Sequence, residues 1–202
     1  MKKSTLTVIG AWLLIIPNLS RRTYATLDRG DGEEIENRIS HTDVDRGKHI
    51  GPAVRGNLYR QLYCHTGYHL QIFPNGTLGG TPEDHNKYAI VHLIKVHPPF
   101  IVAIRGIESG LYLAMNEHGK LYTSRVLNKK CWFLENIYYN LFSVYASARY
   151  PVQRDGWSDQ SKERFWFISV NRDGEPSFME LSEPNKKRVQ FLPRLVDPDK
   201  VF

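Results

Sequence analysis

The pattern of apolar and polar positions predicts a β-hairpin at residues 68–81, YHLQIFPNGTLGGT. Apolar and polar residues alternate before the turn, so Leu70 and Ile72 lie on the same face of the incoming strand. The turn contains Asn75-Gly76, a pair that adopts the positive φ angles of tight hairpin turns at low cost. This stretch is therefore expected to form a strand, a turn and a returning strand.

The same pattern returns twice, at residues 111–124 (LYLAMNEHGKLYTS) and 165–177 (FWFISVNRDGEPS). Leu111, Leu113 and Met115 alternate in the first of these stretches, and Phe165 and Phe167 alternate in the second, each before a turn that contains glycine. The turn glycines Gly76, Gly119 and Gly174 are 43 (119 − 76) and 55 (174 − 119) residues apart. Each interval is long enough for four short strands.

Three four-stranded units predict an all-β chain. From residue 58 onward, no stretch keeps a helical period for three turns. Propeller blades also hold four strands, but propellers use about four to eight blades, so a closed barrel of three hairpin units fits better. We predict a β-trefoil core at residues 58–196 and a C-terminal tail at residues 197–202.

The N-terminal region differs from the rest of the chain. Residues 1–25 resemble an export signal, with Lys2 and Lys3 before an apolar run at residues 6–16. That run is short for a membrane span, although an uncleaved anchor is the alternative. Residues 26–57 are charged and contain few large apolar side chains, which predicts a disordered arm. The mature chain is expected outside the cell, without a membrane span.

Net charge selects no partner. The chain has 27 Lys and Arg residues against 21 Asp and Glu residues, a formal charge of +6. The leader holds four basic and no acidic residues, so its removal leaves 23 − 21 = +2. A partner must be argued from a local cluster, and no nucleic acid is expected.

Two local features concern covalent chemistry. Cys64 and Cys131 are far apart and have apolar or aromatic neighbours, so buried thiols are favoured over a disulfide. Asn75-Gly76-Thr77 is an N-glycosylation sequon on an exposed turn. Turn geometry alone also explains the Asn-Gly pair, so an attached glycan and an unmodified turn both stay open.

Catalytic patterns are weak in this chain. Asp84-His85 has no nucleophile elbow to serve, and there is no phosphate loop or dinucleotide fingerprint. His65 and His69 are four residues apart, which on one strand places them on one face, but no cysteine or carboxylate pattern completes a zinc site. We expect no enzyme, no metal and no cofactor, and instead a protein that acts through its surfaces.

Several separated segments resemble the fibroblast growth factor family. The match begins with Leu62-Tyr63-Cys64 and continues through GYHLQIFPNGT (67–77), EDH (83–85) and IRGIESGLYLAMN (104–116). It continues with the spacing of Cys131, Phe133, Glu135, Asn140 and Tyr145, and with FLPR (191–194) followed by VDPDKV (196–201). The resemblance covers about residues 58–201, and the ending is closest to the glia-activating-factor subgroup, members nine, sixteen and twenty.

This resemblance implies a secreted growth factor for cell proliferation and differentiation. Such a factor binds and dimerises receptor tyrosine kinases through their ectodomains, with heparan sulfate as co-receptor. The positions that match the family's receptor contacts are Tyr63, Glu135, Asn140, Phe142, Leu192 and Arg194. Tyr63, Phe142 and Leu192 would form an apolar platform, and Glu135 would face a receptor arginine. Phe142 replaces a common tyrosine, so a hydrogen bond from that hydroxyl is lost.

The resemblance also implies a heparan sulfate site. Its candidates are Thr66, Arg172, Lys186, Lys187 and Arg188. Residues 175–184 depart from the family because they lack its glycines and most of its basic residues, and Glu180 and Glu183 oppose anion binding. Weaker or shifted heparan sulfate binding is therefore expected.

Other readings stay open beside this one. The resemblance also implies a possible second copy of this chain as a partner, in a homodimer, because members of the named subgroup self-associate. The segment 151–164 is longer than the usual family connection and has no assigned role. A carbohydrate-binding trefoil without signalling is the alternative from another class, although Arg172-Asp173-Gly174 in the third unit matches no repeated pocket. A homologue that acts inside the cell is disfavoured by the leader.

Overall fold

The computed structural model describes residues 59–97, 100–138, 141–152 and 164–197. These residues form twelve β-strands and three short 3-10 helices, with no α-helix among them. The first unit contains β1 (Tyr59–Cys64), β2 (His69–Ile72), β3 (Leu78–Thr81), η1 (Lys87–Ala89) and β4 (Ile90–His97). The second contains β5 (Ile101–Gly106), β6 (Tyr112–Met115), β7 (Leu121–Ser124), η2 (Lys129–Cys131) and β8 (Phe133–Ile137). The third contains β9 (Ser143–Val152), β10 (Arg164–Val170), β11 (Pro176–Leu181), η3 (Lys187–Val189) and β12 (Phe191–Leu195).

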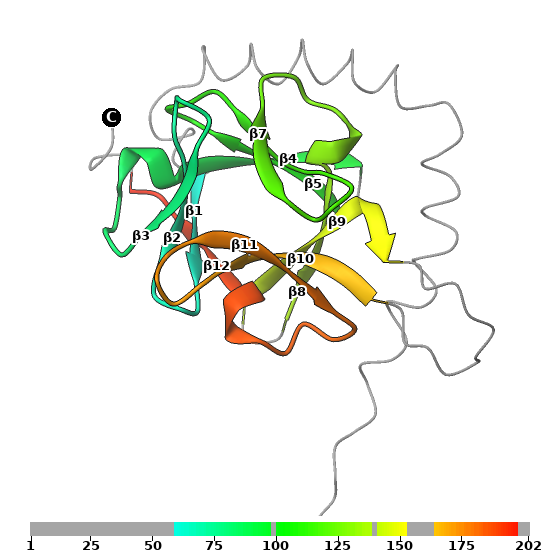
Figure 1. Ribbon diagram of the computed structural model, residues 1–202. Helices are drawn as coiled ribbons and strands as arrows, with labels where there is room; N and C mark the ends of the chain where they lie inside the picture. The colour runs from blue at the N-terminus through cyan, green and yellow to red at the C-terminus, as the bar shows by residue number, and fades with distance from the viewer. Residues whose placement is uncertain (1–58, 98–99, 139–140, 153–163, 198–202) are drawn as a thin grey trace, which may run out of the picture.

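Six of the strands form a closed antiparallel ring. β1 pairs with β4, β4 with β5, β5 with β8, β8 with β9, β9 with β12, and β12 again with β1. The other strands form the hairpins β2–β3, β6–β7 and β10–β11, and each hairpin also pairs with the ring strand before it. This arrangement, visible in Figure 1, is a β-trefoil, so the predicted fold class is confirmed.

The three predicted hairpins are present and their turns are equivalent. In each turn two backbone hydrogen bonds recur at the same spacing, and the glycine adopts a positive φ that few other residues reach at low cost. The first of these bonds joins Phe73 N to Thr77 O, Asn116 N to Lys120 O, and Asn171 N to Glu175 O. The glycines are Gly76, Gly119 and Gly174, with φ of 88°, 78° and 87°.

The hairpins also touch one another, which closes one end of the barrel. Thr123 of β7 donates a hydrogen bond of 2.9 Å to the carbonyl of Gly76 in the first turn. Gly119 packs so closely on the Phe178 ring that an added Cβ would come within 2.6 Å of it. Gly80 lies directly against the backbone of the third turn. Each hairpin therefore contacts the next, in a cycle that follows the pseudo-threefold symmetry.

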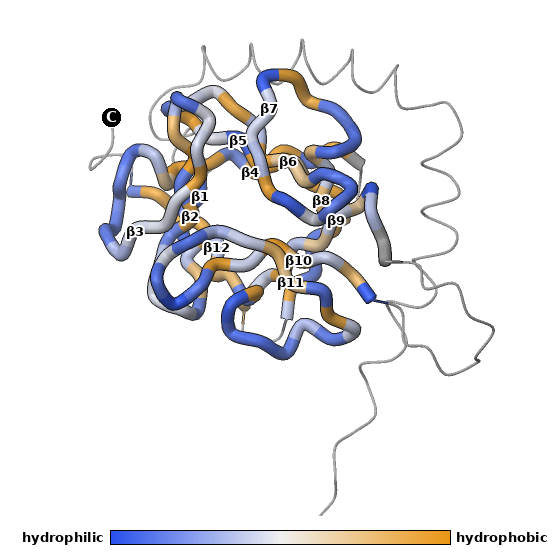
Figure 2. Tube along the Cα trace, in the orientation of Figure 1, coloured by the Kyte–Doolittle hydropathy of each residue, from blue (hydrophilic) through white to orange (hydrophobic). Residues whose placement is uncertain are grey.

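Equivalent positions of the three hairpins supply the centre of the core. Each first strand buries two apolar side chains separated by one residue. These pairs are Leu70 and Ile72, Leu113 and Met115, and Ile168 and Val170. Alternation predicts these positions correctly in the first two hairpins, but in the third it pointed to Phe165 and Phe167, which pack in a separate cluster. Figure 2 shows the same division, with hydrophobic segments along the inner strands and hydrophilic residues in the turns.

Several finer expectations can be compared with the structure. Cys64 and Cys131 are buried free thiols, as predicted. His65 and His69 do not share a strand face, because β1 ends before one and β2 begins at the other. The two ends of the segment 151–164 lie in strands, since β9 extends to Val152 and β10 begins at Arg164.

Some predictions fall outside the described residues. They concern the leader, the arm at residues 26–57, Asn140, residues 153–163 and most of the C-terminal tail.

Candidate binding surfaces

A row of side chains crosses the seam where the first and last strands meet. Tyr63 on β1 is the direct cross-strand partner of Leu192 on β12 and of His69 on β2. Directly opposed residues point to the same side of a sheet and contact one another. The Tyr63 and His69 rings have centroids 5.0 Å apart. The structure thus brings Tyr63 and Leu192 together, as the receptor prediction requires.

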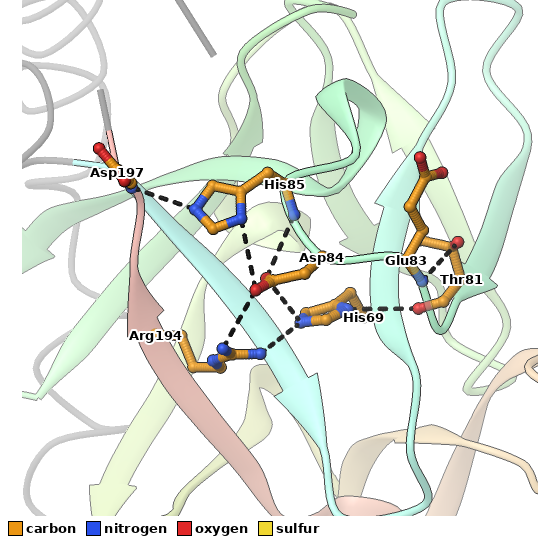
Figure 3. Close-up of polar contacts among 7 residues, drawn as sticks. All are labelled: His69, Thr81, Glu83, Asp84, His85, Arg194 and Asp197. Atoms are coloured by element: carbon orange, nitrogen blue, oxygen red, sulfur yellow. Dashed lines mark hydrogen bonds and ion pairs between the residues drawn. The ribbon is translucent and has the colours of Figure 1, made fainter. Parts of the chain in front are cut away.

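Arg194 extends this row on the same face, two residues beyond Leu192. Its guanidinium lies 5.6 Å from the centre of the Tyr63 ring. One nitrogen, Nη2, is 3.2 Å from Asp84 Oδ2, and the other, Nη1, is 3.4 Å from His69 Nε2 (Figure 3). The side chain is still 40% exposed. It can therefore keep these internal contacts and also face a partner. We call Tyr63, Leu192 and Arg194 the seam surface.

Phe142 lies at the edge of the seam surface. Its ring stacks on His65, with centroids 4.9 Å apart and an angle of 21° between the planes. The backbone N–H of His65 donates to the carbonyl of Gln190, directly before β12, at 2.9 Å. The neighbouring Leu141 has a φ of 67° and is 70% exposed. Sequence reasoning missed Leu141, because its exposure follows from this turn.

Glu135 is mostly buried and is linked to the same seam through Tyr145. Its side chain is only 8% exposed. One carboxylate oxygen accepts a hydrogen bond of 3.0 Å from the Tyr145 hydroxyl, and the other lies 3.1 Å from Lys95 Nζ. Burial, and then the Glu135 charge, raise the pKa of Tyr145 well above its usual value. Tyr145 also packs on Phe191, next to Leu192. Glu135 thus has two internal partners, one of them an exposed lysine.

The candidate anion-binding residues gather where three segments meet. Thr66 Oγ1 donates to Val170 O at 3.3 Å, and the Cys64 thiol lies 3.4 Å from Arg188 O. Arg188 Nη1 donates to Asn171 Oδ1 at 3.0 Å, which joins η3 to the β10–β11 turn. All four basic candidates are exposed, namely Arg172, Lys186, Lys187 and Arg188. We call these four residues the basic surface.

The acidic residues near this surface differ in their surroundings. Glu180 forms an ion pair of 3.3 Å with Arg164, so its charge opposes an anion less than the sequence alone suggests. Glu183 is exposed and lies near Tyr138. Burial, and secondarily the charge of Glu183, raise the pKa of Tyr138 to about 12.

Asn75 is exposed at the first hairpin turn. Its Oδ1 accepts hydrogen bonds from the backbone N–H of Thr77 at 3.0 Å and from the Thr77 hydroxyl at 2.7 Å. The sequon therefore lies on an accessible turn, and its glycosylation stays a prediction.

The fold is that of a β-trefoil protein, and its described residues form two candidate binding surfaces. Comparison with known proteins then gives the family, because the fibroblast growth factor model matches residues 58–192. The chain belongs to the fibroblast growth factor family. Members of this family are secreted growth factors that act on fibroblast growth factor receptors, so the chain is a signalling ligand and not an enzyme.

Individual relatives support the same assignment. Fibroblast growth factor 3 of Gallus gallus is 41% identical over 153 residues, which cover 74% of this chain and 68% of that protein. Fibroblast growth factor 3 of Danio rerio is 37% identical over 194 residues, covering 90% and 73%. The Homo sapiens protein of the same name is 40% identical over 153 residues, covering 74% and 62%.

These relatives correct one prediction. They point to a chain like fibroblast growth factor 3, so the proposed likeness to the glia-activating-factor subgroup is wrong. The homodimer was inferred only from that subgroup, so the comparisons give it no support. Among the described residues no helix is long and apolar enough to cross a membrane.

Proposed function

We propose that this chain is an exported, fibroblast growth factor 3-like ligand. It brings two receptor tyrosine kinases together through their ectodomains, with heparan sulfate as co-receptor. The observation that supports the receptor part is the seam surface, where Tyr63, Leu192 and Arg194 form one continuous aromatic, aliphatic and cationic row. Tyrosine and arginine are enriched among the residues that dominate the energetics of protein interfaces.

The proposed receptor surface extends beyond this row. Phe142 adds a second aromatic ring, and Leu141 adds exposed apolar area on the same turn. Asn140 lies outside the described residues and stays a proposed receptor contact on the family resemblance alone. Glu135 contributes a carboxylate whose internal partner Lys95 is itself 57% exposed, so a receptor cation would compete with that lysine.

The heparan sulfate part of the proposal is supported by the basic surface and Thr66. Sulfate groups need several cations on one face, and the contacts of Arg188 with Asn171 and of Cys64 with the η3 carbonyls hold these cations together. The absence of basic residues in the β11 segment still predicts weaker binding than in typical family members.

Binding to fibroblast growth factor receptor ectodomains, with and without heparin, tests the function. Leu192→Ala should weaken receptor binding by about tenfold or more, since truncation of a central apolar contact costs about 2 kcal/mol. Val126→Ala is the control, because Val126 is an exposed apolar residue on the β7–β8 connection. Thermal unfolding of each variant shows that it is folded. If the wild-type chain binds no receptor ectodomain with heparin present, the proposal fails.

A further inference from the structure

Asp84 connects the turn after β3 to the seam surface. Its Oδ2 accepts from Arg194 Nη2 at 3.2 Å and lies 3.3 Å from His85 Nδ1 (Figure 3). Its Oδ1 accepts from the His85 backbone N–H at 3.2 Å. The same turn also holds the segment directly after β12, because Asp197 N–H donates to His85 Nε2 at 3.3 Å. The strand segment that carries Arg194 is therefore anchored to this turn at two points.

An uncommon backbone conformation and a buried glutamine side chain both define the shape of this turn. His85 has a φ of 58°, in the left-handed region that non-glycine residues enter rarely. Beneath it, Gln61 is fully buried and is the cross-strand partner of Arg194. In the amide orientation that satisfies both groups, Gln61 donates to Asp84 Oδ1 and accepts from His85 N, each at 2.9 Å.

His69 supports Arg194 from the opposite side, and its neighbours fix its protonation. Its Nδ1 is 3.3 Å from the carbonyl oxygen of Thr81, which can only accept, so Nδ1 carries the proton. Its Nε2 is 3.4 Å from Arg194 Nη1, which can only donate, so Nε2 is the acceptor. The Asp84 carboxylate, 3.8 Å from Nε2, is too distant for a hydrogen bond. His69 is therefore neutral, with one tautomer selected.

We propose that Asp84 and His69 are positioning residues of the receptor surface, which hold the Arg194 guanidinium over the Tyr63 ring. This inference rests on the proposed function. A guanidinium has five N–H donors, and the contacts to Asp84 and His69 account for two of them. The fixed plane lets Arg194 offer others to a carbonyl or carboxylate of the receptor.

The benefit of this arrangement is pre-organisation. A free arginine side chain loses about 2 kcal/mol of rotamer entropy when a partner immobilises it. The two internal contacts and the Tyr63 ring already restrict the Arg194 side chain, so much of this entropy is lost on folding and not on receptor binding. Asp84 and His69 thus increase affinity through Arg194, without needing to touch the receptor.

A double-mutant cycle on the full mature chain tests this coupling by receptor-ectodomain affinity at fixed heparin and salt. Asp84→Ala should weaken binding about three- to tenfold, the range expected for ordering by partly exposed charges. Asp84→Ala should add nothing further in the Arg194→Ala background. The matched control is Glu108→Ala, since Glu108 has the same 44% exposure and also holds a cation, Lys87, at 3.1 Å. This control should stay within about twofold of wild type.

Two results would overturn the proposal. One is unchanged affinity in Asp84→Ala, and the other is an undiminished effect of Asp84→Ala in the Arg194→Ala background, which would place Asp84 in an independent role. If Asp84→Ala does not fold, Asp84→Asn replaces it, because the amide keeps the shape but removes the charge.

A measurement without receptor separates this inference from the proposed function. Nitrogen-15 relaxation of the Arg194 side chain should report an ordered Nε–H group in wild type and a mobile one in Asp84→Ala and in His69→Ala. Long-range nitrogen correlation spectra should report protonated Nδ1 on His69. If the wild-type chain binds no receptor, the proposed function fails, while these spectra still decide whether Asp84 and His69 hold Arg194. An equally ordered Arg194 in the variants would refute the positioning role.

Discussion

The contact between the third and first hairpins makes Gly80→Ala a sharp test of the packing. A Cβ at Gly80 would lie 2.4 Å from the carbonyl oxygen of Gly174 and 3.1 Å from its carbonyl carbon. Ordinary contact begins near 3.4 Å, so the two backbones must separate by 3.4 − 2.4 = 1.0 Å. The Gly174 carbonyl is part of the backbone and cannot rotate away as a side chain would, and the barrel holds both hairpins in place.

The adjacent Gly79 provides the matched control. A Cβ there would meet the edge of the Phe73 ring at 2.9 Å, and this partly exposed side chain can turn away. Overpacking costs about 1 to 3 kcal/mol, while alanine in place of glycine stabilises by about 0.4 to 1 kcal/mol through the unfolded chain. The two effects should nearly cancel for Gly79→Ala. For Gly80→Ala the backbone clash should leave a net loss of about 2 kcal/mol.

Equilibrium unfolding in urea, followed by tryptophan fluorescence, measures both variants against wild type. The midpoint should fall clearly for Gly80→Ala at unchanged slope, and it should hardly move for Gly79→Ala. If Gly80→Ala were as stable as Gly79→Ala, the close approach of the first and third hairpins would be refuted.

Two further predictions concern protons and anions. Burial lowers the pKa of His69 below 6.5, against the raising effects of the Thr81 carbonyl and the Asp84 charge and with smaller lowering by the Arg194 and His85 charges, so the unfolded chain binds this proton first. The unfolding free energy should therefore decrease as pH falls below about 6.5, by at most about 1.4 kcal/mol per pH unit, and less steeply in His69→Gln; equal slopes in urea titrations from pH 7.5 to 5.5 would contradict this. Lys186→Asn should give η3 the side-chain cap it lacks, which stabilises by about 0.5 to 1 kcal/mol, and should also lower the salt concentration of elution from immobilised heparin; unchanged elution would exclude Lys186 from heparan sulfate binding.

The hairpins could be predicted from sequence because local rules determine them. Alternation places Leu70 and Ile72 on one face, and a glycine at positive φ reverses the chain. The turn rule holds in all three units and alternation gives the buried face of the first two, so the trefoil follows from repetition. In the third unit the nearly continuous apolar run at 165–170 hides the central face, which Ile168 and Val170 occupy instead of Phe165 and Phe167. The 3-10 turns were not predicted, since three residues carry too little pattern.

The supports of the binding surfaces could not be predicted, because they depend on distant contacts. Asp84 and Arg194 are 110 positions apart, and only the closed barrel brings them together. His69 reads as a polar strand residue, yet it is 1% exposed because the seam covers it. The subgroup prediction failed for a related reason, since it relied on the short ending at residues 191–201, whereas the relatives match over 153 residues or more.

One position where the repeat is broken, the cap of η3, lies where heparan sulfate binding is proposed. Asn86 and Asn128 cap η1 and η2 by accepting from the N–H groups of Tyr88 and Lys130. The equivalent residue of η3 is Lys186, which makes no side-chain cap. Core packing fixes the repeated apolar positions in all three units, so only positions outside the core can differ without loss of the fold. The third unit thus lacks a stabilising cap at the turn where it carries three consecutive basic residues.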